Sequence, residues 1–429
     1  MKLTIRKLHF SILALYLIFV LACKQTTPQP EYGEATQQLI GMLESDPQLK
    51  GMLEKSIAMA SKANPDPNTN PAQTLEDYYA FVSWAETSMP WALLKKGEYP
   101  EIFDNIFQSL CTFYFIVDQP LPELEGRGLV NNSLQYAEPF ASWLVDFSRS
   151  WGRFLDTEAS WNEEYLKMAQ NDPNFGLQNG WYEDPSNWST FNDFFTRYLK
   201  SPEMRPIASP DVDSVVVSFA DSEPMGTWAI DSLSNLIVAD GVPVKSASLR
   251  SVAALLGEDS QYRDAFAGGT LTHSFLNVND YHRYHFPMSG TVKEIRIIPG
   301  INPTGGVIWW DGENNRCAFN PSTKTGWQAV ETRGCVILET EEHGLVALLP
   351  IGMGAVGSVN FEDSLEVGTK VQKGDMLGYF AFGGSDFVML FQEDVKFTLD
   401  APMQEDGSSY KHMLMGERLG YLSLKETED

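Results

Sequence analysis

The stretch FGGSDFVMLF, residues 382–391, combines the pattern of a buried strand with a break near its start. From Phe387 onward it is apolar, but Gly383, Gly384 and Ser385 stand before that run. Glycine weakens a strand, so its presence indicates a bulge or a close backbone approach. Glycine also permits a tight bend, which a serine needs if its hydroxyl is to attack the preceding carbonyl. A surface bulge explains the same residues without chemistry, and spacing alone favours it.

Strand-like segments surround this stretch from about residue 210 onward. Runs rich in β-branched residues alternate with glycine turns, which is typical of strands and hairpins. The clearest are DSVVVSFADS, GTVKEIRIIPG, GCVILETEEHGLVALLPIG and EVGTKVQKGDMLGYF. One helix is expected here, around VKSASLRSVAALLG. The C-terminal region is therefore predicted to be mostly β.

Residues from about 33 to 200 show helical periodicity instead. Apolar residues recur at spacings of three and four residues, as in PFASWLVDFSRSWGRFL. Proline- and asparagine-rich clusters such as NPDPNTNPAQ separate these runs. The many Trp and Phe residues are interpreted as packing between helices. We predict an α+β protein, with a helical accessory domain over 35–190 and a mostly β catalytic domain over 191–429.

The first 22 residues are typical of a signal peptide. Three basic residues precede an apolar run that ends at Ala22 and is too short to span a bilayer. The ending VLAC looks like a bacterial lipobox, so we expect Cys23 to be acylated and residues 23–34 to form a polar tether. This predicts a lipid-anchored protein of the bacterial cell envelope, periplasmic or on the outer surface. An ordinary signal peptide with an incidental cysteine is the alternative.

The mature chain is strongly acidic. Loss of the signal peptide removes three of 31 basic residues and none of the 57 acidic ones, leaving a formal charge of −29. Such a chain repels nucleic acid and anionic membrane surfaces, so no nucleic-acid partner is expected. Of the remaining cysteines, Cys317 and Cys335 could pair, but three buried free thiols, with Cys111, are the preferred interpretation.

Three of the six histidines fall within THSFLNVNDYHRYHFPMSG, residues 272–290. His282 and His285 stand in DYHRYH, and a metal site would need a third ligand such as His273. No HExxH-type motif supports a metal, so none is predicted. A structural histidine pair capped by Asp280 is one alternative. Acid–base chemistry is another, because histidine titrates near neutrality.

Ser385 does not stand in a hydrolase elbow. That motif needs a glycine two residues after the serine, where this chain has Phe387. A nucleophilic serine would still need a base for its proton and an acid to orient that base.

Four motifs, in order over residues 191–391, resemble those of the phosphatidylserine decarboxylase family. They are FNDFFTRYLK with RPI, the FADS segment, DYHRYHFP and KGDMLGYFAFGGS. The helical N-terminal part resembles the accessory domain of a branch that includes soluble amino-acid decarboxylases, such as fungal tryptophan decarboxylases. With it, the resemblance covers most of the mature chain.

This resemblance implies a self-made pyruvoyl cofactor. Ser385 would attack the carbonyl of Gly384, and elimination and hydrolysis would leave a pyruvoyl group at position 385. His285 corresponds to the base that activates the serine, and Asp221 to the acid that orients it. The β chain would end at Gly384 and stay associated with the α chain that follows, while a homo-oligomer is left open.

The resemblance also implies the reaction. The pyruvoyl group would form a Schiff base with the substrate amine, and after loss of CO2 His282 would protonate the substrate carbon. The substrate would be phosphatidylserine, giving phosphatidylethanolamine, or a free amino acid, including an aromatic one, giving its amine. The lipid anchor favours the first, and the acidic charge and accessory domain favour the second. INPTGGVIWWDGENN, residues 301–315, is a candidate substrate loop, although Trp309 and Trp310 equally suit a core.

Two residues depart from the family pattern. Ser222 follows Asp221 where glycine is common, and Asp386 follows Ser385 where serine or threonine is usual. A carboxylate beside the cleavage site could repel a developing oxyanion or act as an extra base. Asp386 therefore keeps open a different class of function, an uncleaved, inactive family member that serves as a surface binding lipoprotein. Retention of Asp221, His285 and Ser385 argues against it.

Overall fold

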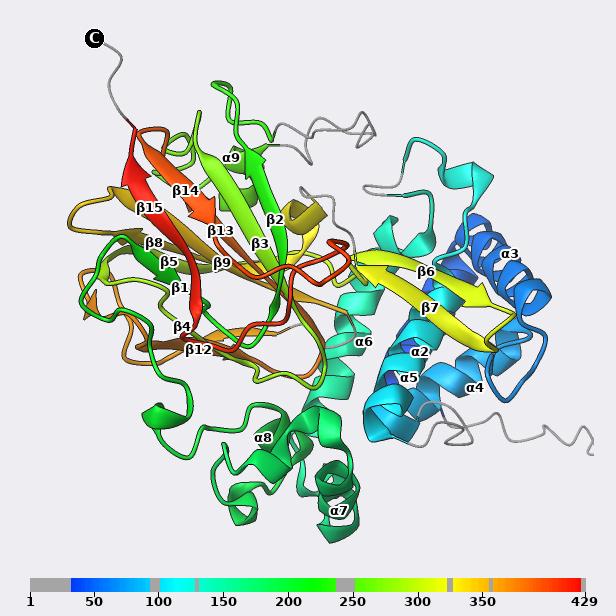
Figure 1. Ribbon diagram of the computed structural model, residues 1–429. Helices are drawn as coiled ribbons and strands as arrows, with labels where there is room; N and C mark the ends of the chain where they lie inside the picture. The colour runs from blue at the N-terminus through cyan, green and yellow to red at the C-terminus, as the bar shows by residue number, and fades with distance from the viewer. Residues whose placement is uncertain are drawn as a thin grey trace, which may run out of the picture.

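Helices and strands are segregated along the chain, and the computed structural model places the helical part beside the β part (Figure 1). The structure describes residues 32–92, 101–127, 131–236, 251–321, 327–354 and 358–425. The predicted α+β class with N-terminal helices is confirmed. The predicted signal peptide and Cys23 lie outside the described residues.

The helical part is built from short and medium α-helices, and several of the connections between them contain single-turn 3₁₀ helices. Its α-helices are α2 (Glu34–Ser45), α3 (Pro47–Ala63), α4 (Leu75–Ala85), α5 (Ile102–Val117), α6 (Phe140–Leu155), α7 (Glu163–Asn171) and α8 (Phe191–Phe195). Local sequence explains where several of them begin. The Asp46 side chain accepts from the first backbone N–H groups of α3, and Thr74 with Asp77 forms a capping box on α4.

Aromatic side chains pack between these helices, as the sequence predicted. The Phe113 and Phe147 rings stack with centroids 4.8 Å apart, and Trp151 lies 5.9 Å from Phe147. The same apolar cluster includes residues from the β part, among them Ile308 and Phe382. The two parts therefore share one core.

The β part is organised around an antiparallel seven-stranded sheet in the order β11-β5-β8-β9-β13-β3-β2. Its strands are β2 (Glu223–Ala229), β3 (Thr270–Leu276), β5 (Gly290–Ile298), β8 (Thr332–Glu339), β9 (Leu345–Met353), β11 (Lys370–Val371) and β13 (Gly384–Phe391). The strands expected around residues 290, 336, 348 and 387 are confirmed. Of the expected helix over 244–257, the described residues contain α9 (Val252–Leu256).

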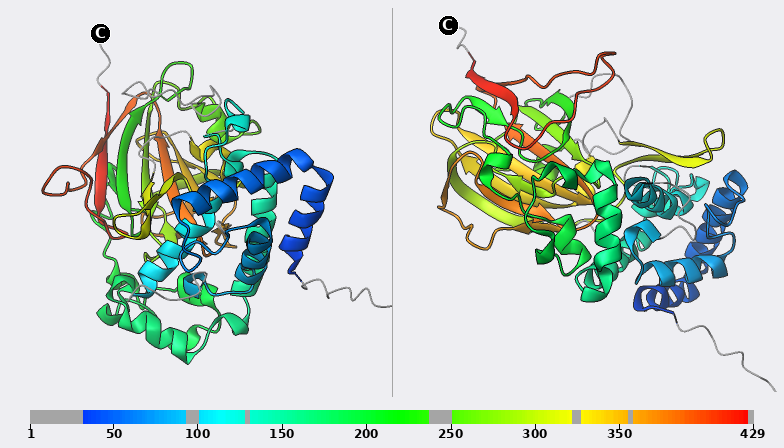
Figure 2. Two further views of the ribbon diagram at one scale, coloured as in Figure 1. Left: turned by 90° about the vertical axis from the view of Figure 1, so that its right-hand side faces the viewer. Right: turned by 60° about the horizontal axis from the view of Figure 1, so that its bottom comes forward.

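Smaller sheets complete the β part. One has the order β10-β12-β4 and another β1-β15-β14. Their strands are β1 (Val215–Val217), β4 (Arg283–His285), β10 (Val359–Phe361), β12 (Met376–Phe380), β14 (Val395–Leu399) and β15 (Arg418–Leu424). A hairpin of β6 (Gly306–Asp311) and β7 (Arg316–Pro321) reaches from the sheets over the helices (Figure 2). The candidate substrate loop therefore includes a strand, with Trp309 exposed and Trp310 packed on the shared core.

Strand β13 has apolar packing on both faces. Phe387, Met389 and Phe391 belong to one buried cluster, while Val388 and Leu390 belong to another. Side chains alternate between the faces of a strand, so a strand buried on both faces reads as a continuous apolar run. This is why FVMLF shows no polar alternation.

Among the described residues, the structure contains no helix whose length and apolar character would let it cross a membrane.

The shared core predicts a large effect of truncating Trp151. Its side chain is fully buried, its indole N–H donates to the Ser88 carbonyl at 2.8 Å, and its ring meets Phe382 at 5.5 Å. We expect Trp151→Ala to lower the free energy of unfolding by about 3–5 kcal/mol. Trp84, with 39% of its surface exposed, provides the matched control, and Trp84→Ala should cost less than about 1 kcal/mol. Urea denaturation followed by circular dichroism measures both, and equal losses would contradict a core shared through Trp151.

Candidate active site

Ser385 stands at the start of β13, behind a backbone bend. Gly383 has φ of +151°, a region that favours glycine. A Cβ on Gly384 would lie 2.9 Å from Met353 Cγ, because Gly384 pairs with Met353 on β9. Gly383 is therefore required by the backbone bend, and Gly384 by the close approach of β9. The Ser385 side chain is buried, and its hydroxyl has no hydrogen-bond partner among the described residues.

The pairing of β13 decides where the Ser385 side chain points. Its pairing with β3 and β9 shows no register shift, so Ser385 shares a face with Phe387. The Phe387 ring stacks on Phe219 at 3.8 Å and meets Tyr284 at 5.8 Å. Phe219 lies two residues before Asp221, and Tyr284 precedes His285. The face of β13 that carries Ser385 therefore packs on the segments next to both predicted partners, but the Ser385 hydroxyl bonds to neither Asp221 nor His285.

Asp386 points to the opposite face. One carboxylate oxygen lies 3.2 Å from Nδ1 of His273, and the other accepts from the Gln328 amide at 3.0 Å. His273 also stacks on Trp228, with ring centroids 4.8 Å apart. The carboxylate that departs from the family pattern is thus bound away from the Ser385 hydroxyl. His273 serves this contact and does not join His282 and His285.

His285 is buried on β4 in a defined tautomer. Nδ1 lies 2.8 Å from the Gly374 carbonyl, which can only accept, so Nδ1 carries the proton. Nε2 then accepts from the Tyr281 hydroxyl at 3.1 Å. Burial lowers the pKa of His285 to about 4, although the Gly374 carbonyl and the charge of Asp221 oppose this. A neutral imidazole with its lone pair on Nε2 has the form of a general base.

Asp221 does not make the contact that was predicted for it. Its carboxylate accepts from Nε and Nη2 of buried Arg205 at 2.9 and 2.6 Å, and from the backbone N–H of Met415 at 2.8 Å. Both ring nitrogens of His285 bond elsewhere. The direct hydrogen bond from Asp221 to His285 is therefore absent from this structure, and the Gly374 carbonyl orients the ring. The Arg205 guanidinium lies 4.4 Å from the centre of the Trp181 ring, which adds a cation–π contact.

His282 is fully buried, and its two ring nitrogens have no well-formed hydrogen bond to the described residues. Its ring stacks on Phe195 at 3.9 Å, and neither nitrogen makes a hydrogen bond of good geometry among the described residues. Burial, and then the charge of Arg197, lower the pKa of His282 to about 3, while backbone groups of Val278 and Asn277 oppose this. Buried polar groups are nearly always paired, so an unpaired imidazole is typical of a functional site.

Arg197, from the FFTR motif, fixes the loop that precedes His282. Its guanidinium donates to the carbonyl oxygens of Asn279 and Asp280 at 3.0 and 3.2 Å. The same guanidinium lies 4.4 Å from the centre of the Tyr182 ring. The role of this motif is therefore to hold the loop between β3 and β4 in place.

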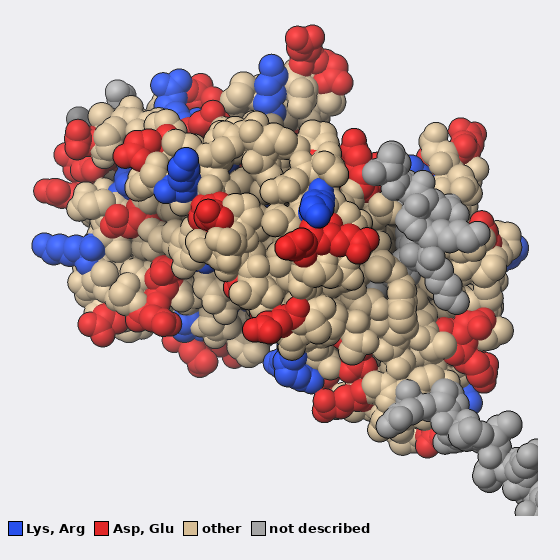
Figure 3. Space-filling view, turned by 90° about the horizontal axis from the view of Figure 1, so that it is seen from below, with Lys and Arg blue, Asp and Glu red and all other residues tan. Residues whose placement is uncertain are grey.

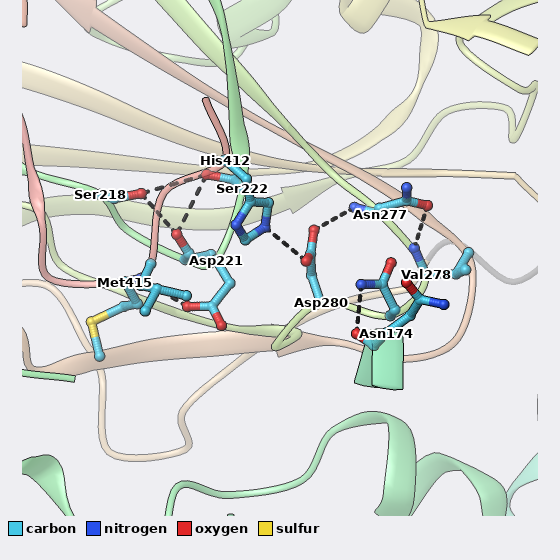
Figure 4. Close-up of polar contacts among 12 residues, drawn as sticks. Asn174, Ser218, Asp221, Ser222, Asn277, Val278, Asp280, His412 and Met415 are labelled. Atoms are coloured by element: carbon cyan, nitrogen blue, oxygen red, sulfur yellow. Dashed lines mark hydrogen bonds and ion pairs between the residues drawn. The ribbon is translucent and has the colours of Figure 1, made fainter. Parts of the chain in front are cut away.

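Asp280 caps a different histidine from the one predicted. Its carboxylate lies 2.8 Å from Nε2 of His412 and accepts from the Asn277 N–H at 2.7 Å (Figure 4). The interpretation of His282 and His285 as a pair capped by Asp280 is therefore wrong. His412 lies near the C-terminus, outside every motif that pointed to this site. With Asp221 it lines a pocket of about 260 Å³.

The remaining sequence candidates lie apart from this site. Cys111, Cys317 and Cys335 are buried free thiols, as preferred. Within the described ranges, no group of three or more His, Cys, Asp or Glu side chains has the geometry to hold a metal ion. The residues missed as partners are Arg197, Arg205, Tyr281, Gly374 and His412. All of these except His412 were present in quoted motifs, which gave a signal for their importance but not for their role.

Comparison with known proteins agrees with the motif order. A sequence profile of the phosphatidylserine decarboxylase family matches residues 191–421. The chain is 34% identical over 244 residues to phosphatidylserine decarboxylase proenzyme 2 of Oryza sativa subsp. japonica, covering 56% of this chain and 35% of that protein. It is 29% identical over 283 residues to the phosphatidylserine decarboxylase proenzyme of Saccharophagus degradans, covering 64% and 93%. It is 28% identical over 269 residues to decarboxylase iboD of Amanita muscaria, covering 56% and 74%.

The chain spans only part of some relatives. It covers about a third of the rice protein and 22% of phosphatidylserine decarboxylase proenzyme 3 of Schizosaccharomyces pombe.

Buried His282 and exposed His412 predict opposite pH effects. The unfolded chain binds a proton at a histidine below pH 6.5, but folded His282 stays neutral until about pH 3. Its contribution to stability is therefore lost as the pH falls below 6.5, by up to about 1.4 kcal/mol per pH unit. We expect His282→Gln to flatten the dependence of unfolding free energy on pH between 4 and 6.5. Urea midpoints across that range measure it.

His412 provides the opposing control. Burial lowers its pKa, but the hydrogen bond and charge of Asp280 outweigh this and raise it overall. Its contribution is present at acid pH and is lost as the pH rises through the folded pKa. His412→Gln should therefore destabilise the chain most at the acid end. Identical pH slopes in wild type and His282→Gln would show that His282 is not held neutral.

Proposed function

Because this chain belongs to the phosphatidylserine decarboxylase family, we propose that it is a carboxy-lyase that cleaves itself between Gly384 and Ser385. The observation that carries the proposal is the buried, unpartnered Ser385 hydroxyl behind a glycine bend. It lies on the strand face whose Phe387 packs on Phe219 and Tyr284, which stand two residues before Asp221 and one before neutral His285. The word proenzyme in the names of the relatives supports processing.

The residues present fit the formation of a pyruvoyl group. Ser385 Oγ would attack the Gly384 carbonyl carbon, and His285 Nε2 would take the hydroxyl proton. Collapse with protonation of the Ser385 nitrogen would replace the peptide bond by an ester. Loss of the Cα proton and of the Gly384 carboxylate would leave a dehydroalanine, which water converts to the pyruvoyl group with release of ammonia. Gly383 and Gly384 allow the bend that this attack requires.

Once formed, a pyruvoyl group would supply a carbonyl that condenses with the substrate amine and withdraws electrons as CO2 leaves. His282 would hold the proton for the substrate carbon, because even a neutral imidazole keeps one N–H. Stacking on Phe195 fixes the ring, and its nitrogens are available because no described residue gives them a hydrogen bond of good geometry. A general acid placed in this way contributes about 10²–10⁴-fold.

The substrate class follows from the family, either phosphatidylserine or a free amino acid. We propose in addition that acylated Cys23 holds the protein in the bacterial envelope. Acidic side chains outnumber basic ones on the face in Figure 3, in keeping with a formal net charge of −26 for the whole sequence. An anionic membrane would repel such a surface, so a lipid anchor rather than charge would hold the protein there.

The alternative, an uncleaved binding lipoprotein, rested on Asp386. Its carboxylate is bound by His273 and Gln328 on the face opposite to Ser385. The Asp386 carboxylate is therefore in a poor position to repel an oxyanion that forms at the Gly384 carbonyl. This removes the observation that favoured the alternative.

Intact mass under denaturing conditions tests self-cleavage. Wild type is expected to give two fragments, and the smaller should start at position 385 with a blocked N-terminus. Ser385→Ala should remain one chain, whereas Ser364→Ala, at an exposed serine, should process like wild type. His285→Ala should slow processing by about 10²–10⁴-fold. His282→Ala should cleave normally but release no CO2 from substrate. An uncleaved wild type that behaves like Ser385→Ala would contradict the proposal.

A further inference from the structure

An apolar cavity reaches the proposed cleavage site from the helical part. Helix α5 contributes Phe107, Leu110 and Tyr114, and the β6–β7 hairpin contributes Ile308 and Phe319. Gly384 and its strand partner Met353 form part of the wall. The cavity has a volume of about 60 Å³, and its lining surface is almost wholly apolar, which favours an apolar ligand.

The cavity also borders the loop that carries the predicted proton donor. Asn277 and Val278 line it, and they begin the loop between β3 and β4 in which His282 stands. A group in this cavity would therefore contact Gly384, next to the residue that reacts, and the loop that carries the histidine. These are the two positions that a substrate side chain must neighbour when its amine is bound at residue 385.

The lining restricts what can occupy the cavity. It contains no Lys, Arg, His, Asp or Glu among the described residues, and the Tyr114 hydroxyl is already committed to the Asn302 carbonyl at 2.8 Å. In phosphatidylserine a phosphodiester follows the serine within a few bonds. Burial of an unpaired phosphate is costly, and nothing in this lining would pair with it.

We propose that this cavity binds the side chain of a free amino acid that is apolar, and that α5 and the β6–β7 hairpin select it. The inference rests on the proposed function, because it assumes that residue 385 becomes the reacting group. It assigns to the helical part a direct role in substrate choice. It also assigns Ile308, on the candidate substrate loop, to the pocket wall, while exposed Trp309 on the same strand points away.

The test compares substrates on the full processed chain. Decarboxylation would be measured as CO2 release from leucine, methionine, phenylalanine, tryptophan and serine, and from phosphatidylserine in mixed phosphatidylcholine vesicles. At least one apolar amino acid is expected to exceed serine and phosphatidylserine in kcat/KM by tenfold or more. Higher kcat/KM for phosphatidylserine or serine would overturn the inference.

Two pocket variants and one control sharpen the test. Leu110→Trp should fill the cavity and lower kcat/KM for the preferred amino acid at least tenfold, and Ile308→Ala should shift preference toward a larger side chain. Trp309→Ala should change neither. All three should process normally by intact mass. If Leu110→Trp folds and processes but keeps the substrate profile of wild type, the pocket is not the selecting site.

A binding measurement distinguishes failure of this inference from failure of the proposed function. The unprocessed Ser385→Ala chain, with and without Leu110→Trp, would be titrated with toluene and followed by calorimetry. Toluene binding that Leu110→Trp abolishes supports the cavity as an apolar site even if wild type does not process, a result that would overturn the proposed function alone. Absence of toluene binding in Ser385→Ala would overturn the inference.

Discussion

The in-register pairing of β13 with both β9 and β3 is the constraint on which the site depends. It fixes Ser385 on one face and Asp386 on the other, because side chains alternate along a strand. It also presses Gly384 against Met353, where a Cβ would not fit. A one-residue slip would exchange the two faces and bury the carboxylate where the hydroxyl now lies. The placement of the Ser385 side chain is therefore set by the sheet rather than by a loop.

The helical part is joined to this strand through its entry segment. Phe382 packs edge-on against Trp151 and Phe195, and its backbone N–H donates to the Asn192 side chain at 3.2 Å. Phe195 in turn stacks on His282. One aromatic cluster thus holds both the bend before Ser385 and a candidate catalytic ring. A change in the packing of the helical part would move both together.

Much of the fold could be predicted because its signals are local. Glycine turns and apolar runs marked β5, β8, β9 and β13, and a period of three to four marked the helices. Residues 301–315 were interpreted as a substrate loop although they contain β6, because the packing of this hairpin against the distant helix α5 leaves no local signal in the sequence. The contacts of Asp221 and Asp280 were missed because Arg205, Met415 and His412 are brought there only by tertiary structure. The order of motifs showed which residues gather, but not which atoms bond.

The same pairing bears on what would hold two chains together after cleavage. A cut before Ser385 would leave β13 hydrogen-bonded on both edges, and β15 paired with β1 and β14. Met415 would still donate to Asp221, and His412 would still bond to Asp280, so the later segment contacts the earlier one at the site itself. Separating the fragments would break these ladders and expose the apolar faces of β13. Cleavage would therefore release backbone constraint only at the bend, where a newly formed chain end needs room to react.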